Sequence, residues 1–154
     1  MHLRLFVIIG VFFLGQFAVA AEDNDDAITH CLKAWGSESP FGKNPKFKTI
    51  ETSVKVFGIG SNPKDTEKTT SPALVLVHPA VNVMGGTIYE LMNPNGWYCF
   101  QANVNVMGGL VIKAQCKAHL ASASSGATFL GSSNSESKGV SVMGSTKVEV
   151  VGCH

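Results

Sequence analysis

Apolar and polar residues alternate along most of the chain after residue 48. Residues 112 to 120 show this most clearly, with apolar residues at even positions and lysine, glutamine or histidine at odd positions. Residues 97 to 106 and 140 to 151 repeat the alternation, and residues 73 to 78 form a short apolar run. A period of two, rich in β-branched residues and interrupted by glycine and asparagine, is typical of strands. The pattern predicts an all-β domain over residues 49 to 154.

One segment before the strands has a helical pattern instead. Four apolar residues recur with the spacing i, i+3, i+4, i+7, which places them on one face of a short helix. Asp25 or Asp26 can cap its N-terminus, and Gly36 can end it. We expect this helix to cap one end of the β-rich domain or to cover one of its faces, and a loop to follow up to residue 48. The four apolar residues are Ile28, Cys31, Leu32 and Trp35.

The hexapeptide VNVMGG occurs twice, at residues 81 to 86 and 104 to 109, which are 23 residues apart. A degenerate copy ends at Gly131, another 23 residues on, and further copies lie at residues 54 to 58 and 140 to 144. An interval of this size is typical of one coil of a β-solenoid, whose coils stack on each other. We therefore predict a single β-solenoid, like a right-handed β-helix, with coils of about 23 residues. A β-sandwich of similar hairpins is the alternative.

In a solenoid, equivalent side chains of successive coils become neighbours. We expect Asn82 and Asn105 to point outward and to form a polar ladder. The valines on either side of each asparagine would then point into the core. The glycines are expected at a corner, where a side chain would collide or the backbone needs positive φ.

The methionine before each corner glycine has two interpretations. We favour burial as corner packing, because a bulge at the glycines or the helix can cover it. The alternative is an outward apolar stripe, which would mark an interface. Trp97 is a second candidate for exposure, since the alternation places Tyr98 and Phe100 in the core. The possible binding surface therefore comprises Met84, Met107, Met143 and Trp97.

The first twenty residues have the features of a secretory signal peptide. Arg4 precedes an apolar run over residues 5 to 14, and a small-x-small pattern ends at Ala20. The apolar run is short for a membrane-spanning helix. We expect cleavage before Ala21, export to the periplasm or the extracellular space, and a mature chain that does not span the membrane. This chain would consist of a helix and loop over residues 21 to 48, followed by the β-rich domain.

Four cysteines follow the signal segment, an even number that predicts two disulfides in an oxidising compartment. The sequence permits three pairings. We favour a bond between Cys31 on the helix and Cys99 on a strand, which leaves Cys116 to pair with Cys153. A zinc site is the alternative, but residues three apart on a strand point to opposite faces, so we predict no metal. Its ligands would be Cys116, His119, Cys153 and His154.

Charge and motifs argue against nucleic-acid binding and catalysis. Without its single arginine, in the signal segment, the chain carries eleven lysines and eleven acidic residues. Arginine and a basic surface favour nucleic-acid binding, so we expect no such partner. The chain has no G-x-S-x-G motif, and His30 and His78 have no recognisable catalytic partner. A pocket that brought together His78, Glu90 or His119 would favour an enzyme. We therefore predict a protein without catalytic residues or cofactors.

The motif V-x-V-M/F-G-x, followed by a β-branched strand at residues 81 to 91 and 140 to 150, resembles the repeats of bacterial cell-envelope β-solenoid domains. These include the C-terminal domain of cell-wall-active antibiotic-response proteins and adhesin-like domains. The resemblance implies an envelope location and a scaffold or binding role. We therefore predict a noncatalytic structural or binding protein, whose partner is an envelope component, a glycan or another protein. The alternatives are an adhesin or glycan-binding module and a small secreted enzyme.

Overall fold

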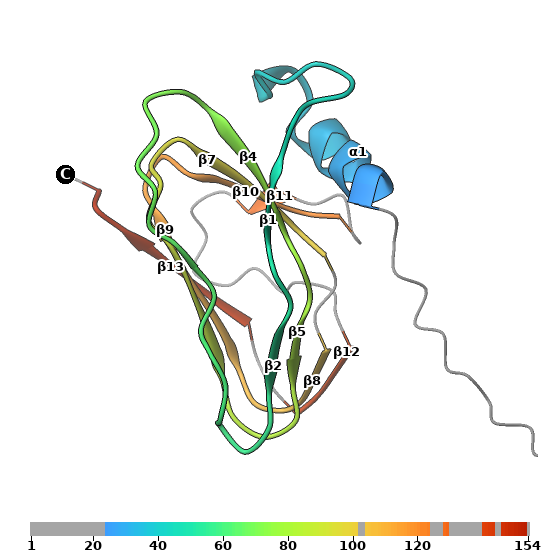
Figure 1. Ribbon diagram of the computed structural model, residues 1–154, viewed down its shortest axis with the longest axis vertical. Helices are drawn as coiled ribbons and strands as arrows, with labels where there is room; N and C mark the ends of the chain where they lie inside the picture. Colours follow the sequence, from blue (N-terminus) through green and yellow to red (C-terminus); the bar gives the residue numbers. More distant parts are fainter. Residues whose placement is uncertain (1–23, 102–103, 124–127, 130–139, 144–145, 154) are drawn as a thin grey trace, which may run out of the picture.

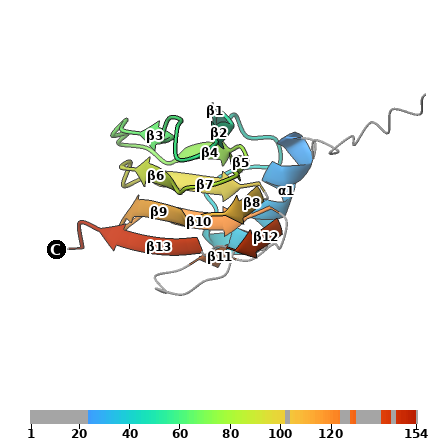
Figure 2. The ribbon, with the colours of Figure 1, turned by 90° about the horizontal axis from the view of Figure 1, so that it is seen from below.

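The computed structural model describes residues 24 to 101, 104 to 123, 128 to 129, 140 to 143 and 146 to 153. Within these residues, the strands form three sheets, and the chain visits each sheet in turn before it returns to the first. Successive passes stack as the coils of a β-solenoid of about three turns (Figure 1, Figure 2). The β-solenoid prediction is confirmed, and the β-sandwich alternative is wrong.

The chain begins with a helix, α1 (Asn24–Trp35), and a 3-10 turn, η1 (Gly36–Glu38). The first sheet contains, in spatial order, β1 (Lys48–Ile50), β4 (Ala73–Val77), β7 (Gly96–Phe100), β10 (His119–Ser122) and β11 (Thr128–Phe129). The second contains β12 (Val140–Met143), β8 (Val104–Met107), β5 (Ala80–Asn82) and β2 (Ser53–Lys55). The third contains β13 (Thr146–Val151), β9 (Leu110–Gln115), β6 (Thr87–Leu91) and β3 (Lys64–Asp65). These strand pairs are parallel, apart from β10 with β11.

The coil length is 23 residues in the middle of the solenoid and longer at the C-terminal end. Val81 in β5 pairs with Val104 in β8, 23 positions later. On the side away from β5, β8 pairs with β12, which contains the next copy of the motif in the stack. β12 begins 36 positions after β8. The copy expected at residues 127 to 131 therefore does not supply the next coil. Its β11 segment pairs antiparallel with β10 instead, and Gly131 lies outside the described residues.

The corner glycines lie at close approaches between coils, as expected. Gly85 has a φ of 128°, a conformation that side chains disfavour. A Cβ at this position would also lie 2.8 Å from the Cα of Gly58 in the coil before. The Gly58 amide donates a hydrogen bond of 2.6 Å to the carbonyl oxygen of Met84, which joins the two corners.

The first hexapeptide points the opposite way from our expectation. Asn82 is fully buried and accepts a 2.5 Å hydrogen bond from the Thr87 hydroxyl, while Val83 is 36% exposed and Val81 is half-buried. The outward ladder is therefore wrong for Asn82. Alternation shows that neighbours face opposite sides but not which side is the core, and Thr87 supplies the buried amide with a partner. The side chains of the second copy, Val104, Asn105 and Val106, lie outside what the structure describes.

The helix α1 covers the outer face of the first sheet and lies beside the stack of coils (Figure 2). Ile28, Cys31 and Trp35 are buried in the same apolar cluster as Leu74 and Leu76 of β4. The helical spacing in the sequence is thus confirmed, and the helix covers a face. Because the other face of β4 is turned to the interior of the solenoid, this strand is apolar on both sides. This explains the continuous apolar run in the sequence.

Candidate binding surfaces

Both disulfides join the cysteine pairs that the sequence favours. Cys31 on α1 bonds to Cys99 on β7, and both residues are fully buried. Cys116, just after β9, bonds to Cys153, just after β13, and both residues are exposed. The first bond holds the helix on the sheet, and the second links the last coil to the coil before it. Two disulfides are compatible with a protein that folds in an oxidising compartment.

Exposed apolar side chains lie above one another at the corner between the second and third sheets. Met84 is 38% exposed and Met107 is 46% exposed, and the Gly85 amide joins their coils by donating to the carbonyl oxygen of Met107 at 2.9 Å. Phe57, at the same corner of the first coil, is 70% exposed. We call Phe57, Met84 and Met107 the corner stripe. The expected burial of Met84 and Met107 is wrong, because α1 covers the first sheet and leaves this corner in solvent.

Further apolar side chains adjoin the corner stripe. Val83 is 36% exposed, and Val56 and Ile59 of the first coil are 42% and 79% exposed. The backbone of Met143 pairs with that of Met107, so the last coil continues the line, although the Met143 side chain lies outside the described residues. Apolar side chains exposed side by side usually mark an interface, whereas scattered ones do not.

Trp97 is not an exposed binding residue. Its side chain is 6% exposed, and its ring stacks on that of His119, with centroids 3.7 Å apart and planes 9° apart. Trp35 and Phe41 meet the same ring edge-on, at centroid distances of 5.2 and 5.8 Å. The prediction of a freer Trp97 is wrong, because α1 and the segment after it pack on the outer face of β7.

A groove of about 520 Å³ adjoins this aromatic group. Proline rings and the side chains of Glu38, Lys117 and His119 line it. Burial lowers the pKa of His119, and the nearby Glu38 carboxylate opposes that change to a smaller extent. The Nδ1 atom of His119 is buried and has no hydrogen-bond partner among the described residues. The imidazole is therefore expected to be neutral at pH 7.

The groove does not bring together the groups that a catalytic or metal site would use. His78 and Glu90 do not line it. The chain turns between Cys116 and His119, so these residues do not lie on one continuous strand, and both line the groove. The sulfur of Cys116, however, is held in a disulfide and is not free to bind a metal. Within the described ranges, no three histidine, cysteine or acidic residues are placed to hold a metal ion.

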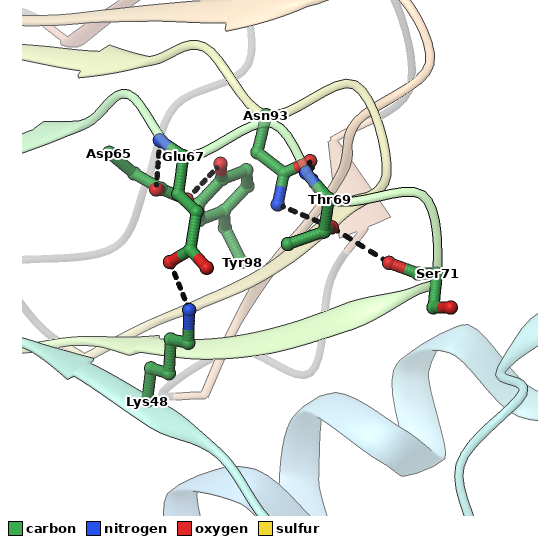
Figure 3. A network of polar contacts seen from close by, with 7 residues as sticks. All are labelled: Lys48, Asp65, Glu67, Thr69, Ser71, Asn93 and Tyr98. Atoms are coloured by element: carbon green, nitrogen blue, oxygen red, sulfur yellow. Dashed lines mark hydrogen bonds and ion pairs between the residues drawn. The ribbon is translucent and has the colours of Figure 1, made fainter.

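A polar network fastens the segment after β3 to the rest of the solenoid (Figure 3). The Tyr98 hydroxyl donates to Asp65 Oδ2 at 2.6 Å. Burial raises the pKa of Tyr98 well above its usual range, and the bond to Asp65 raises it further. The backbone amide of Glu67 donates to Asp65 Oδ1 at 3.2 Å, and the Glu67 carboxylate pairs with Lys48. The network thus connects a buried tyrosine to an ion pair on the surface.

The same segment is held at a second point by Asn93. The Asn93 side-chain amide donates to Thr69 Oγ1 at 3.0 Å, and Thr69 Oγ1 donates to the carbonyl oxygen of Ser71 at 2.8 Å. The Asn95 side chain donates to the Thr69 carbonyl oxygen at 2.6 Å. Because these polar groups bond to one another, we assign them a structural role.

No family model matches the chain, and no curated protein or solved structure matches it either. The resemblance to cell-envelope repeats therefore stays a prediction. Among the described residues, no helix is long and apolar enough to cross a membrane.

Proposed function

We propose that this chain is an exported, noncatalytic protein of the cell envelope or extracellular space that binds a partner through the corner stripe. The observation that carries this proposal is the alignment of Met84 and Met107 in successive coils, with both side chains exposed. Side chains stacked along a solenoid form a rigid, straight surface, because the hydrogen bonds between the coils fix their spacing.

Methionine and phenylalanine suit such a surface. Apolar groups gain free energy when a partner removes them from water, and methionine adapts its shape to irregular partners. The partner would therefore present an apolar face of its own. The predicted signal peptide and the two disulfides support an oxidising location.

A glycan-binding role has less support. The aromatic residues from which a sugar platform would be built are Trp97, Tyr98 and Phe100, and they are 6%, 0% and 2% exposed. The groove beside Trp97 offers the partly exposed ring of His119 instead. We therefore place the main binding surface at the corner stripe.

The test is cosedimentation of the purified mature chain with the envelope fraction of the cells that produce it. We expect the unaltered chain to sediment with this fraction. Met84→Ser combined with Met107→Ser should lower the apparent affinity about tenfold or more, since each change removes apolar contact area.

Met92→Ser is the matched control, because it makes the same substitution at a partly exposed methionine that follows β6, at the opposite end of this strand from the corner stripe. It should bind as the unaltered chain does. The proposal fails if the unaltered chain stays in the supernatant, or if the double variant sediments as well as the control. N-terminal sequencing of the exported protein tests the location separately and should begin at Ala21.

A further inference from the structure

The large apolar side chains that are exposed in the described part of the chain gather on one side of the solenoid, with Val150 as the exception. They lie on the second sheet or in the turns that lead from it to the third sheet, at the end of the molecule opposite α1 (Figure 1). Apolar exposure confined to one region indicates a surface that another body covers. We call this set the apolar patch, and it comprises Val54, Val56, Phe57, Ile59, Val83, Met84 and Met107.

A tight turn in the first coil presents two of these side chains. The backbones of Val56 and Ile59 bond to each other in both directions, so Phe57 and Gly58 form a two-residue turn. Both central residues have positive φ, 53° for Phe57 and 76° for Gly58. Asparagine or aspartate suits the first of these positions, whereas a bulky residue is strained there. Phe57 and Ile59 are 70% and 79% exposed, so packing in the core does not explain them. A strained, exposed aromatic residue indicates a functional role for the turn.

The segments that lead from the second sheet into the third carry no exposed charge. Residues 79 to 89, 102 to 112 and 139 to 146 contain no acidic or basic residue. Between residues 53 and 63 of the first coil, the one charged residue is Lys55, which is 5% exposed. Its ammonium group donates to Asn62 Oδ1 and to the carbonyl oxygen of Gly86. An apolar phase could therefore cover the apolar patch without taking a solvated charge out of water.

Hydrogen bonds between the coils also prepare this corner for an apolar environment. The Gly58 amide donates to the carbonyl oxygen of Met84, and the Gly85 amide donates to that of Met107. Each bond pairs a backbone donor with an acceptor inside the protein, as hydrocarbon requires. The same bonds hold Phe57, Met84 and Met107 in a line with the spacing of neighbouring strands, about 4.8 Å. The corner stripe can therefore meet a flat surface along its whole length.

Size and shape favour a lipid surface over a protein as the covering body. A protein interface of ordinary size takes about 20 to 30 residues from each side, and the apolar patch has far fewer. The corner stripe also runs along the outside of a turn between two sheets (Figure 1). A protein partner would need a groove that matches this turn, whereas lipids rearrange around an inserted side chain.

We propose that the corner stripe and the turn at residues 56 to 59 enter the surface of a lipid bilayer, at the boundary between headgroups and hydrocarbon. Phe57 and Ile59 enter deepest, because they are the most exposed of the apolar patch. The inference rests on the proposed function and identifies the partner of the corner stripe as lipid. Since no exposed charge takes part, binding needs no anionic lipid.

The experiment is flotation of the purified, oxidised mature chain with vesicles of phosphatidylcholine, alone or mixed with phosphatidylglycerol. The chain should float with both kinds of vesicle to a similar extent, and added salt should not release it, because salt screens only charges. Phe57→Ser combined with Ile59→Ser should lower the partition coefficient about tenfold or more, since it removes two apolar side chains from the contact. Met92→Ser, away from the corner stripe, should float as the unaltered chain does.

Phe57→Trp reports the depth of insertion. The native Trp35 and Trp97 are 4% and 6% exposed, so the new indole is the one that meets the vesicle. Its emission should shift to shorter wavelength on binding, and brominated lipid chains should quench it. Lys33→Trp is the matched control, because Lys33 is exposed on α1, at the opposite end of the molecule (Figure 1). This control should show neither effect.

Circular dichroism and thermal unfolding establish that each variant is folded. The bilayer inference is wrong if the unaltered chain does not float, if it floats only with anionic vesicles and salt releases it, or if the folded double variant floats equally well. A chain that sediments with the envelope fraction through Met84 and Met107 but does not float contradicts the bilayer alone, and its partner is then a protein. Failure of both sedimentation and flotation contradicts the proposed function as well.

Discussion

The carbonyl oxygen of Gly85 occupies the place where a side chain on Gly108 would begin. A Cβ built on Gly108 would lie 1.5 Å from that oxygen and 2.7 Å from the Gly85 carbonyl carbon. Both atoms belong to the backbone of the neighbouring coil, so they cannot move aside as a flexible side chain can. The repeated glycine pair in the hexapeptide therefore permits the close stacking of the coils at this corner.

Gly108→Ala should lower the free energy of unfolding by about 3 kcal/mol or more, because the added methyl group forces two coils apart. Urea denaturation of the oxidised mature chain measures the change. Gly42→Ala is the control, because a Cβ at Gly42 would meet no atom within 4 Å. This control should stay within about 0.5 kcal/mol of the unaltered chain. Equal stability of the two variants would contradict the stacking of Gly108 on Gly85.

The burial of Asn82 gives a second prediction. Asn82→Ala should lower the free energy of unfolding by about 2 kcal/mol, because it leaves the buried Thr87 hydroxyl without the acceptor that it now uses. Val83→Ala, next to it but partly exposed, should cost much less. Urea denaturation compares the two. If Val83→Ala lowered the stability more than Asn82→Ala, the valine would point into the core and the asparagine outward, which would contradict the burial of Asn82.

The two disulfides should differ in how easily they are reduced. A thiol reductant reaches the exposed Cys116–Cys153 bond directly, whereas Cys31 and Cys99 are fully buried between α1 and β7. Limited reduction in native buffer, followed by alkylation and peptide mapping, should therefore label Cys116 and Cys153 first. Labelling of Cys31 or Cys99 at the same rate would show that the helix does not protect its disulfide.

The tyrosines predict how stability depends on pH. Burial raises the pKa of both Tyr89 and Tyr98 above the ordinary value of 10.0, and Asp65 adds to the increase for Tyr98. Above pH 10 the unfolded chain loses these protons while the folded chain keeps them, so the free energy of unfolding falls as the pH rises. The slope should approach about 1.4 kcal/mol per pH unit for each tyrosine.

Urea denaturation at a series of alkaline pH values measures this slope. Tyr98→Phe should reduce it, and the ultraviolet absorbance of tyrosinate should appear only as the chain unfolds. Tyrosinate that forms in the folded chain near pH 10 would contradict the burial of these hydroxyls.

Much of the architecture could be predicted from local patterns. The spacing of Ile28, Cys31 and Trp35 predicts the buried face of α1, and the 23-residue interval between the hexapeptides predicts the stacking of β5 on β8. The favoured cysteine pairs also form. These features depend on periodicity and on pairing between regular elements, and both are visible in one sequence.

Apart from the copy at residues 127 to 131, which does not supply the next coil, the errors concern which side of an element is covered. Alternation could not show that Asn82 points inward, since this depends on a partner, Thr87, on the next side of the coil. The exposure of Met84 and Met107 and the burial of Trp97 depend on where α1 packs. The sequence could not show which sheet α1 covers. The spacing of its apolar residues identifies the buried side of the helix but not the sheet on which that side packs.

The parallel, in-register stacking of coils is tested most directly by a new disulfide between register partners. Glu90 and Lys113 lie opposite each other on adjacent strands. The double variant Glu90→Cys with Lys113→Cys should form an intramolecular bond on mild oxidation, because cross-strand neighbours lie within disulfide range. Glu90→Cys with Val111→Cys, one diagonal step out of register, should form little. Peptide mapping that finds the first bond supports the solenoid, and a bond only in the diagonal variant, or in neither, would contradict it.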